Sequence, residues 1–147
     1  MSDDDMDVEE QIAMLNKSLA LQQRSVLQYA LTAGSIVGLE FQAHARTLHD
    51  FAGAELDDAV RLVEKITALG GDPTTEAAEP DWTGDPVEQL DKLIEAERET
   101  LETLQASIDP TGREAASEAI EHRLEHIIMR KQEQVDYLLR AGRRPDG

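Results

Sequence analysis

The stretch "IIMRKQEQVDYLL", residues 127–139, decides how this sequence folds. Its apolar residues recur at alternating steps of three and four, which is the pattern of a helix that buries one face. Lys131 and Gln134 fall on that same face, between Ile127 and Leu138. Because burying an unpaired ammonium group is costly, we expect these two side chains to meet polar partners, bind a ligand or reach water.

Three earlier stretches carry a similar apolar seam, and each seam is interrupted once. The seams lie within residues 8–33, 41–69 and 87–108, and their interruptions are Gln22, Glu55 and Glu97. One polar residue on a helix seam is common, but one on each of four helices at compatible heights predicts a shared polar site. Asp58, one turn after Glu55 on the flank of the same face, is a further candidate for this site.

Capping and turn signals set the ends of the four predicted helices. A capping box that starts at Asp7 opens the first helix and leaves residues 1–7 as an acidic tail. Gly70 is expected to end the second helix, and Asp85 to cap the third. Residues 141–147 are expected to form a C-terminal tail.

The links between these helices are unequal in length. Those near residues 34–38 and 109–112 are short, so each joins two antiparallel neighbours. The link at residues 71–85 can span about 50 Å when extended, against about 42 Å for a helix of about 28 residues. We therefore predict an all-α four-helix bundle over residues 8–140, with two antiparallel hairpins joined by a long crossover. A plain up-and-down bundle with a flexible loop is the alternative.

The composition limits the classes of protein and partner. The 147-residue chain has no cysteine, which excludes disulfides and thiolate metal sites. It has no apolar run of about 20 residues, and its start is acidic, so we expect a cytoplasmic protein without a membrane span. Its formal net charge of −17 argues against nucleic-acid or anionic-membrane partners. The acidic, lysine-poor composition is typical of halophilic proteins, with an ordinary acidic protein as the alternative.

Three motifs resemble the ferritin-like superfamily, and bacterioferritins within it. "LNKSLALQQRSVLQY", residues 15–29, is similar to the first helix of that family. "ELDDAVRLVEKITALGGDP", residues 55–73, resembles its second helix, and "QVDYL", residues 134–138, resembles its fourth. The motifs agree in order, spacing and position on the seams. The resemblance implies a ferritin-like bundle with a di-iron site, built from one Glu on each of two helices and a Glu-x-x-His on each of the other two.

The residues at the implied ligand positions depart from that pattern. The four glutamate positions fall on Gln22, Glu55, Glu97 and Lys131, and the two histidine positions fall on Asp58 and Gln134. An ammonium group has no lone pair for a metal and repels a cation.

We therefore expect a structural or partner-binding protein with a degenerate ferroxidase centre that is metal-free or binds metal weakly, and in which Lys131 bridges Glu55 and Glu97. The alternative is a divergent ferroxidase or iron-storage protein that binds iron through Glu55, Asp58 and Glu97. A different register of the last helix is a third possibility.

The remaining candidate sites carry weaker signals. His122 and His126 share one helix face and could bind a surface metal, although an exposed face without metal is favoured. Tyr29 matches a family tyrosine near the metals, or is a seam aromatic with a hydrogen-bonded hydroxyl. The family's haem-binding methionine position is Leu56 here, so no haem is implied. Trp82 is expected to pin the crossover. Such bundles form oligomers, and we favour a homodimer.

Overall fold

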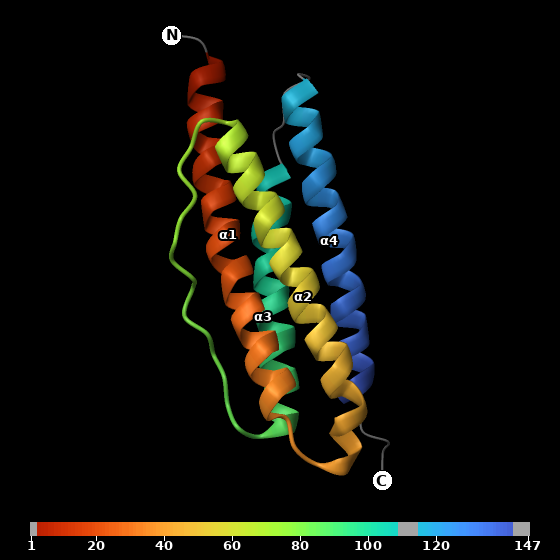
Figure 1. The fold of residues 1–147 in the computed structure, drawn as a ribbon. Helices are drawn as coiled ribbons and strands as arrows, with labels where there is room; N and C mark the ends of the chain where they lie inside the picture. The colour runs from red at the N-terminus through yellow and green to blue at the C-terminus, as the bar shows by residue number, and fades with distance from the viewer. Residues whose placement is uncertain (1–2, 109–114, 143–147) are drawn as a thin grey trace.

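Four long helices form the protein in the computed structural model, which describes residues 3–108 and 115–142 (Figure 1). The side chains are described for residues 8–107 and 121–142. The helices are α1 (Asp3–Ser35), α2 (Leu39–Ala68), α3 (Pro86–Ile108) and α4 (Ala115–Gly142). The described residues contain no strand. The prediction of an all-α four-helix bundle is therefore confirmed.

The helices pair as the link lengths predict. α1 packs most extensively against α2, and α3 against α4, while α1 also packs along α3. The chain between α2 and α3 runs the length of the bundle beside α1 (Figure 1). The long crossover, and not the plain up-and-down alternative, is thus the observed topology. Among the described residues, no helix is long and apolar enough to cross a membrane.

The helix ends agree with the sequence signals at most places. α2 ends at Ala68, and Gly70 follows with φ 84°, a conformation that glycine adopts without strain. The N–H of Gly71 donates to the carbonyl of Ile66 at 2.9 Å, which completes a Schellman motif. At the start of α3, the N–H of Val87 donates to Asp85 Oδ1 at 3.3 Å, as expected of an N-cap.

The predicted boundaries differ from the structure at the two ends of the bundle. α1 begins at Asp3, so residues 3–7 continue the helix instead of forming an acidic tail. Acidic side chains are favourable in the first turn of a helix, which explains why this charge run can be helical. α4 continues to Gly142, two residues beyond the expected end. The predicted break at residues 109–112 lies outside the described part of the chain.

Polar contacts from α1 hold the crossover, which we call the strap (residues 71–85). Asn16 Nδ2 donates to the carbonyl of Asp72 at 3.0 Å, and the N–H of Ala78 donates to the carbonyl of Ala20 at 2.9 Å. Further along, Gln28 Nε2 donates to the carbonyl of Asp81 at 3.1 Å. Trp82, expected to pin this segment, is instead 41% exposed. Hydrogen bonds therefore fix the strap to α1 from Asp72 to Asp81.

The hydrophobic core is divided into two parts. One cluster comprises Leu15, Leu19, Ala59, Leu62, Ile66, Leu104, Leu124 and Ile127. The other comprises Tyr29, Ile36, Leu48, Leu90, Leu93, Ile94 and Leu138. On every helix the interrupting polar residue lies in the sequence between the members of the two clusters. A buried polar layer thus separates two apolar layers.

Candidate functional site

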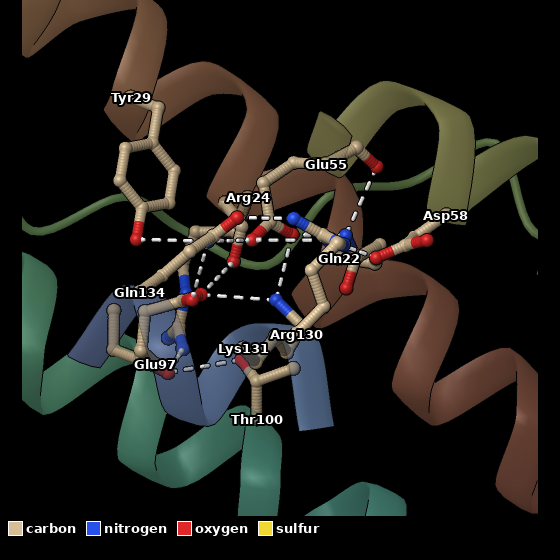
Figure 2. A network of polar contacts seen from close by, with 12 residues as sticks. Gln22, Arg24, Tyr29, Glu55, Asp58, Glu97, Thr100, Arg130, Lys131 and Gln134 are labelled. Carbon is tan, nitrogen blue, oxygen red and sulfur yellow. Dashed lines mark hydrogen bonds and ion pairs between the residues drawn. The ribbon is translucent and has the colours of Figure 1, made fainter. Parts of the chain in front are cut away.

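The centre of the polar layer is the Lys131 ammonium group. Its Nζ lies 2.6 Å from Glu55 Oε2 and 3.0 Å from Glu97 Oε1. The side chains of Lys131 and Glu55 are 0% exposed, and that of Glu97 is 1% exposed. Figure 2 shows these groups converging from α2, α3 and α4. The structure therefore brings together the three charged residues that interrupt the predicted seams.

Amide and hydroxyl groups complete the hydrogen bonds of the two carboxylates. Gln134 Nε2 lies 2.6 Å from Glu55 Oε1 and 3.2 Å from Glu97 Oε2. Gln22 Nε2 donates to Glu55 Oε2 and, at 2.9 Å, to the Glu55 carbonyl. Ser25 Oγ donates to Glu97 Oε1 at 3.0 Å. All four carboxylate oxygens thus accept hydrogen bonds from the protein itself, as buried charges require.

Tyr29 lies beside this network, with its ring in the core and its hydroxyl toward the polar layer. Its side chain is completely buried, and Gln134 Nε2 lies 3.2 Å from its hydroxyl oxygen. Its ring meets that of Phe51 edge to face, at a centroid distance of 5.7 Å. Burial, together with the negative charges of Glu97 and Glu55, raises the pKa of the phenol well above 10.0. Tyr29 therefore stays protonated.

Arg130 is a member of the network that the seam pattern does not reveal. It is hydrogen-bonded to Asp58 Oδ2 and to Gln134 Oε1, and its NH2 lies 3.7 Å from Glu55 Oε1. Asp58 therefore pairs with Arg130, whereas Lys131 pairs with Glu55 and Glu97. The available signal was spacing, because Arg130 and Gln134 are four residues apart on one helix. An arginine beside a seam is, however, ordinarily a solvated side chain.

The charges in the layer oppose the effect of burial to different degrees. Burial raises the pKa of Glu55, but the charge and hydrogen bond of Lys131, with Arg130 and Gln134, outweigh it and hold this pKa below 4.5. Burial raises the pKa of Glu97 to about 7, since Lys131 compensates only in part and Glu55 adds repulsion. Burial lowers the pKa of Lys131, but the two carboxylates raise it by more. Lys131 is therefore a permanent internal cation.

A di-iron centre, which the resemblance implies, does not fit these residues. At the position where the family has a glutamate ligand, Lys131 places an ammonium group. The oxygens of Glu55 and Glu97 that would bind the metal already accept hydrogen bonds from N–H donors. Gln134 turns its amide nitrogen, which cannot ligate a metal, toward both glutamates. Across the described side chains, no three His, Cys, Asp or Glu residues are grouped to hold a metal ion.

The predicted surface pair lies away from this layer. His122 and His126 are both exposed on α4, and His122 Nδ1 lies 3.9 Å from Glu125 Oε2. His44, a residue without a predicted role, is hydrogen-bonded to the hydroxyl of Tyr137. Leu56, at the position of the family's haem methionine, is 54% exposed on α2.

Comparisons with known proteins agree with this architecture. A structure described as a ferritin-like, diiron-carboxylate protein from Bacillus anthracis is 26% identical, with a TM-score of 0.87 over 97% of this chain and 100% of that one. A bacterioferritin-related dodecameric thioferritin from Bacteroides fragilis is 19% identical, with a TM-score of 0.81 over 91% and 84% of the two chains. Rhodobacter capsulatus bacterioferritin, described with a metal-free dinuclear site and haem iron, is 18% identical, with a TM-score of 0.76 over 88% and 81%.

No curated protein matches the sequence. The ferritin-like domain family, however, matches residues 12–141. Since this match covers most of the chain, the protein belongs to the ferritin-like family.

Proposed function

We propose that this protein is a ferritin-like bundle in which a lysine-centred ion-pair network replaces the di-iron centre. It acts as a structural or partner-binding member of its family and not as a ferroxidase. The observation that carries the proposal is the position of Lys131 Nζ between the buried carboxylates of Glu55 and Glu97, at 2.6 and 3.0 Å.

Charge balance supports this reading. Two buried carboxylates need a cation, and in this chain that cation is a side chain of the protein. Arg130 neutralises Asp58 in the same way at the edge of the layer. Lys131 leaves neither a lone pair nor room for a divalent cation at the point that the glutamates share. The charged groups of the layer therefore pair with one another, while Gln22 Oε1 is buried without a hydrogen-bond partner among the described residues.

Metal analysis of protein purified without chelator tests the proposal. Less than about 0.1 iron or manganese ion per chain, and no Fe(II) oxidation above the protein-free rate, are expected because the counter-ion is built in. The paired measurement uses Glu55→Ala.

About two iron ions per chain, lost in Glu55→Ala, would overturn the proposal. That result would favour the divergent iron-binding oxidase or storage protein that uses Glu55, Asp58 and Glu97. Metal retained in Glu55→Ala would place it elsewhere on the protein and leave the proposal standing.

We also propose that the protein forms a homodimer through the outer face of α1 and α2. Leu27 and Leu31 on α1 are 42% and 37% exposed, and Leu56 and Val60 on α2 are 54% and 50% exposed. Between these helices lies a groove with small residues along its walls, among them Gly53. Exposed apolar side chains around such a groove are typical of a protein–protein interface.

Leu56→Glu tests this interface. The substitution puts a charge on the apolar face, so the expected result is a monomer in sedimentation-velocity analysis, with unchanged far-UV circular dichroism. Leu139→Glu, an equally drastic change at a 42% exposed leucine of α4, is the matched control and should remain dimeric. A wild-type monomer, or a Leu56→Glu dimer, would contradict the proposal.

A further inference from the structure

A surface pocket lies over the polar layer, between α2 and α4. It has a volume of about 440 Å³, and its charged lining includes Arg61, Arg123 and Arg130. Volumes of this size are typical of small-molecule sites. The pocket is thus separated from the buried network by Arg130, which takes part in both.

Three arginines in one pocket are unusual for this chain, which has a formal net charge of −17. Arg123, His126, Arg130 and Glu133 recur at steps of three and four, so they line one face of α4 next to its buried seam. Arg61 joins them from α2. This flank of α4 therefore places two arginines, Arg123 and Arg130, next to the seam that carries Lys131.

Two of these arginines are without a partner in the part of the chain that the structure describes. Arg130 is committed to Asp58 and Gln134. Arg61 and Arg123 make no hydrogen bond or ion pair with any described residue. The Arg130 guanidinium offsets the Asp58 carboxylate, and the exposed Glu133 at the wall offsets one further charge. With His126 neutral, the lining retains one net positive charge and two guanidinium groups that can bind a ligand.

We propose that this pocket binds a small phosphorylated molecule, whose phosphate group is held by Arg61 and Arg123. A guanidinium group presents a planar pair of N–H donors that matches two phosphate oxygens, and each such bond is charge-assisted. The cavity is larger than a free phosphate ion requires, which favours a phosphate ester over the bare anion. This site does not rest on the proposed function, since it uses neither glutamate of the buried network.

The experiment titrates metal-stripped protein with inorganic phosphate and, separately, with glycerol 3-phosphate, at constant ionic strength, by isothermal titration calorimetry. Stripping matters because a bound metal ion would itself attract phosphate. The variants are Arg61→Gln with Arg123→Gln, and Arg123→Lys alone. Arg98→Gln is the matched control, because Arg98 is an exposed arginine on α3, outside this pocket.

Wild type and Arg98→Gln should bind the ester more tightly than inorganic phosphate. The double variant should lose about tenfold or more in affinity. Arg123→Lys should lose less, since lysine keeps the positive charge but lacks the planar pair of N–H donors. Equal affinity in wild type and the double variant would overturn the proposal, as would the absence of binding of either probe. Preference for inorganic phosphate would overturn the assignment of an ester. The far-UV spectra and melting temperatures of the variants show whether they fold.

Discussion

Replacing Lys131 by methionine removes the cation at the centre of the protein while keeping a side chain of similar length. Lys131 makes ion pairs of 2.6 Å with Glu55 and 3.0 Å with Glu97, and all three side chains are at most 1% exposed. Solvent therefore screens neither the attraction in the native protein nor the repulsion in the variant. The two carboxylates would face each other, and among the described side chains the remaining cation within 4 Å of either is Arg130, 3.7 Å from Glu55.

Breaking a buried pair in this way typically costs about 3–5 kcal/mol. For a chain of this length, that loss corresponds to a melting temperature lower by about 10 °C. The loss must also depend on pH. Without Lys131 the pKa of Glu97 rises further above 7, and a carboxyl whose pKa is raised on folding stabilises less as pH rises. The destabilisation is therefore expected to be larger at pH 8 than at pH 6.

Urea unfolding followed by far-UV circular dichroism at both pH values measures this effect, at one fixed protein concentration because association of the chains would be coupled to folding. Lys17→Met is the matched control. Lys17 is exposed on α1, so its replacement should change the unfolding free energy by about 0.5 kcal/mol or less.

A triple variant separates lost charge pairing from lost packing. Combining Lys131→Met with Glu55→Gln and Glu97→Gln removes every charge of the central triad, and stability should recover most of the loss at pH 8. An unchanged unfolding free energy in Lys131→Met would refute the reasoning, because it would mean that the ammonium group reaches water. A loss that is the same at both pH values and is not recovered by the triple variant would assign the effect to packing alone.

Three further predictions follow from the same site and from the end of α2. Glu97→Gln should flatten the pH dependence of stability. Because the native pKa of Glu97 is about 7, the wild type loses stability as the pH rises from about 4.5 to 7, by a few kcal/mol at most. Urea unfolding across this range measures the slope, and an unaltered slope in the variant would contradict the reasoning. Lys131→Glu with Gln134→His should create Fe(II) affinity detectable by calorimetry, and no binding would argue against these two positions as the family's ligand positions. Gly70→Ala should lower the unfolding free energy by about 1 kcal/mol because φ is 84°, whereas Gly84→Ala serves as its control in thermal melts.

The fold could be predicted because hydrophobic periodicity and link length act together. Steps of three and four mark the helix seams, and their central positions, such as Leu48, Leu62, Leu104 and Leu124, are all buried. The long strap alone distinguished a crossover topology from an up-and-down bundle. The predicted start of α1 was wrong because a run of aspartates is typical of a solvated tail, although the same charges are favourable at a helix N-terminus.

The site was predictable only as far as its members lie on seams. Gln22, Glu55, Glu97, Lys131 and Gln134 interrupt apolar stripes, and a buried polar residue needs partners, so their meeting could be inferred. The pairing of individual oxygen and nitrogen atoms could not be inferred, because it depends on how far the four helices are shifted along one another in the bundle.

The sequence did not predict Arg130 as a member of the network for a related reason. Its position beside the seam is compatible with solvent, and only the packing of α4 against α2 turns its guanidinium toward Asp58. The sequence consequently groups Asp58 with the glutamates, whereas its partner in the structure is this arginine.

The strap has a consequence for how two chains can meet. It is the single covalent connection between the α1–α2 hairpin and the α3–α4 hairpin, and an extended strap could equally deliver the second hairpin to another copy of the protein. The hydrogen bonds that Asn16 and Gln28 donate to the strap, and the one that the Ala20 carbonyl accepts from it, hold the strap against its own first helix. They therefore favour a chain that closes on itself over two chains that exchange halves.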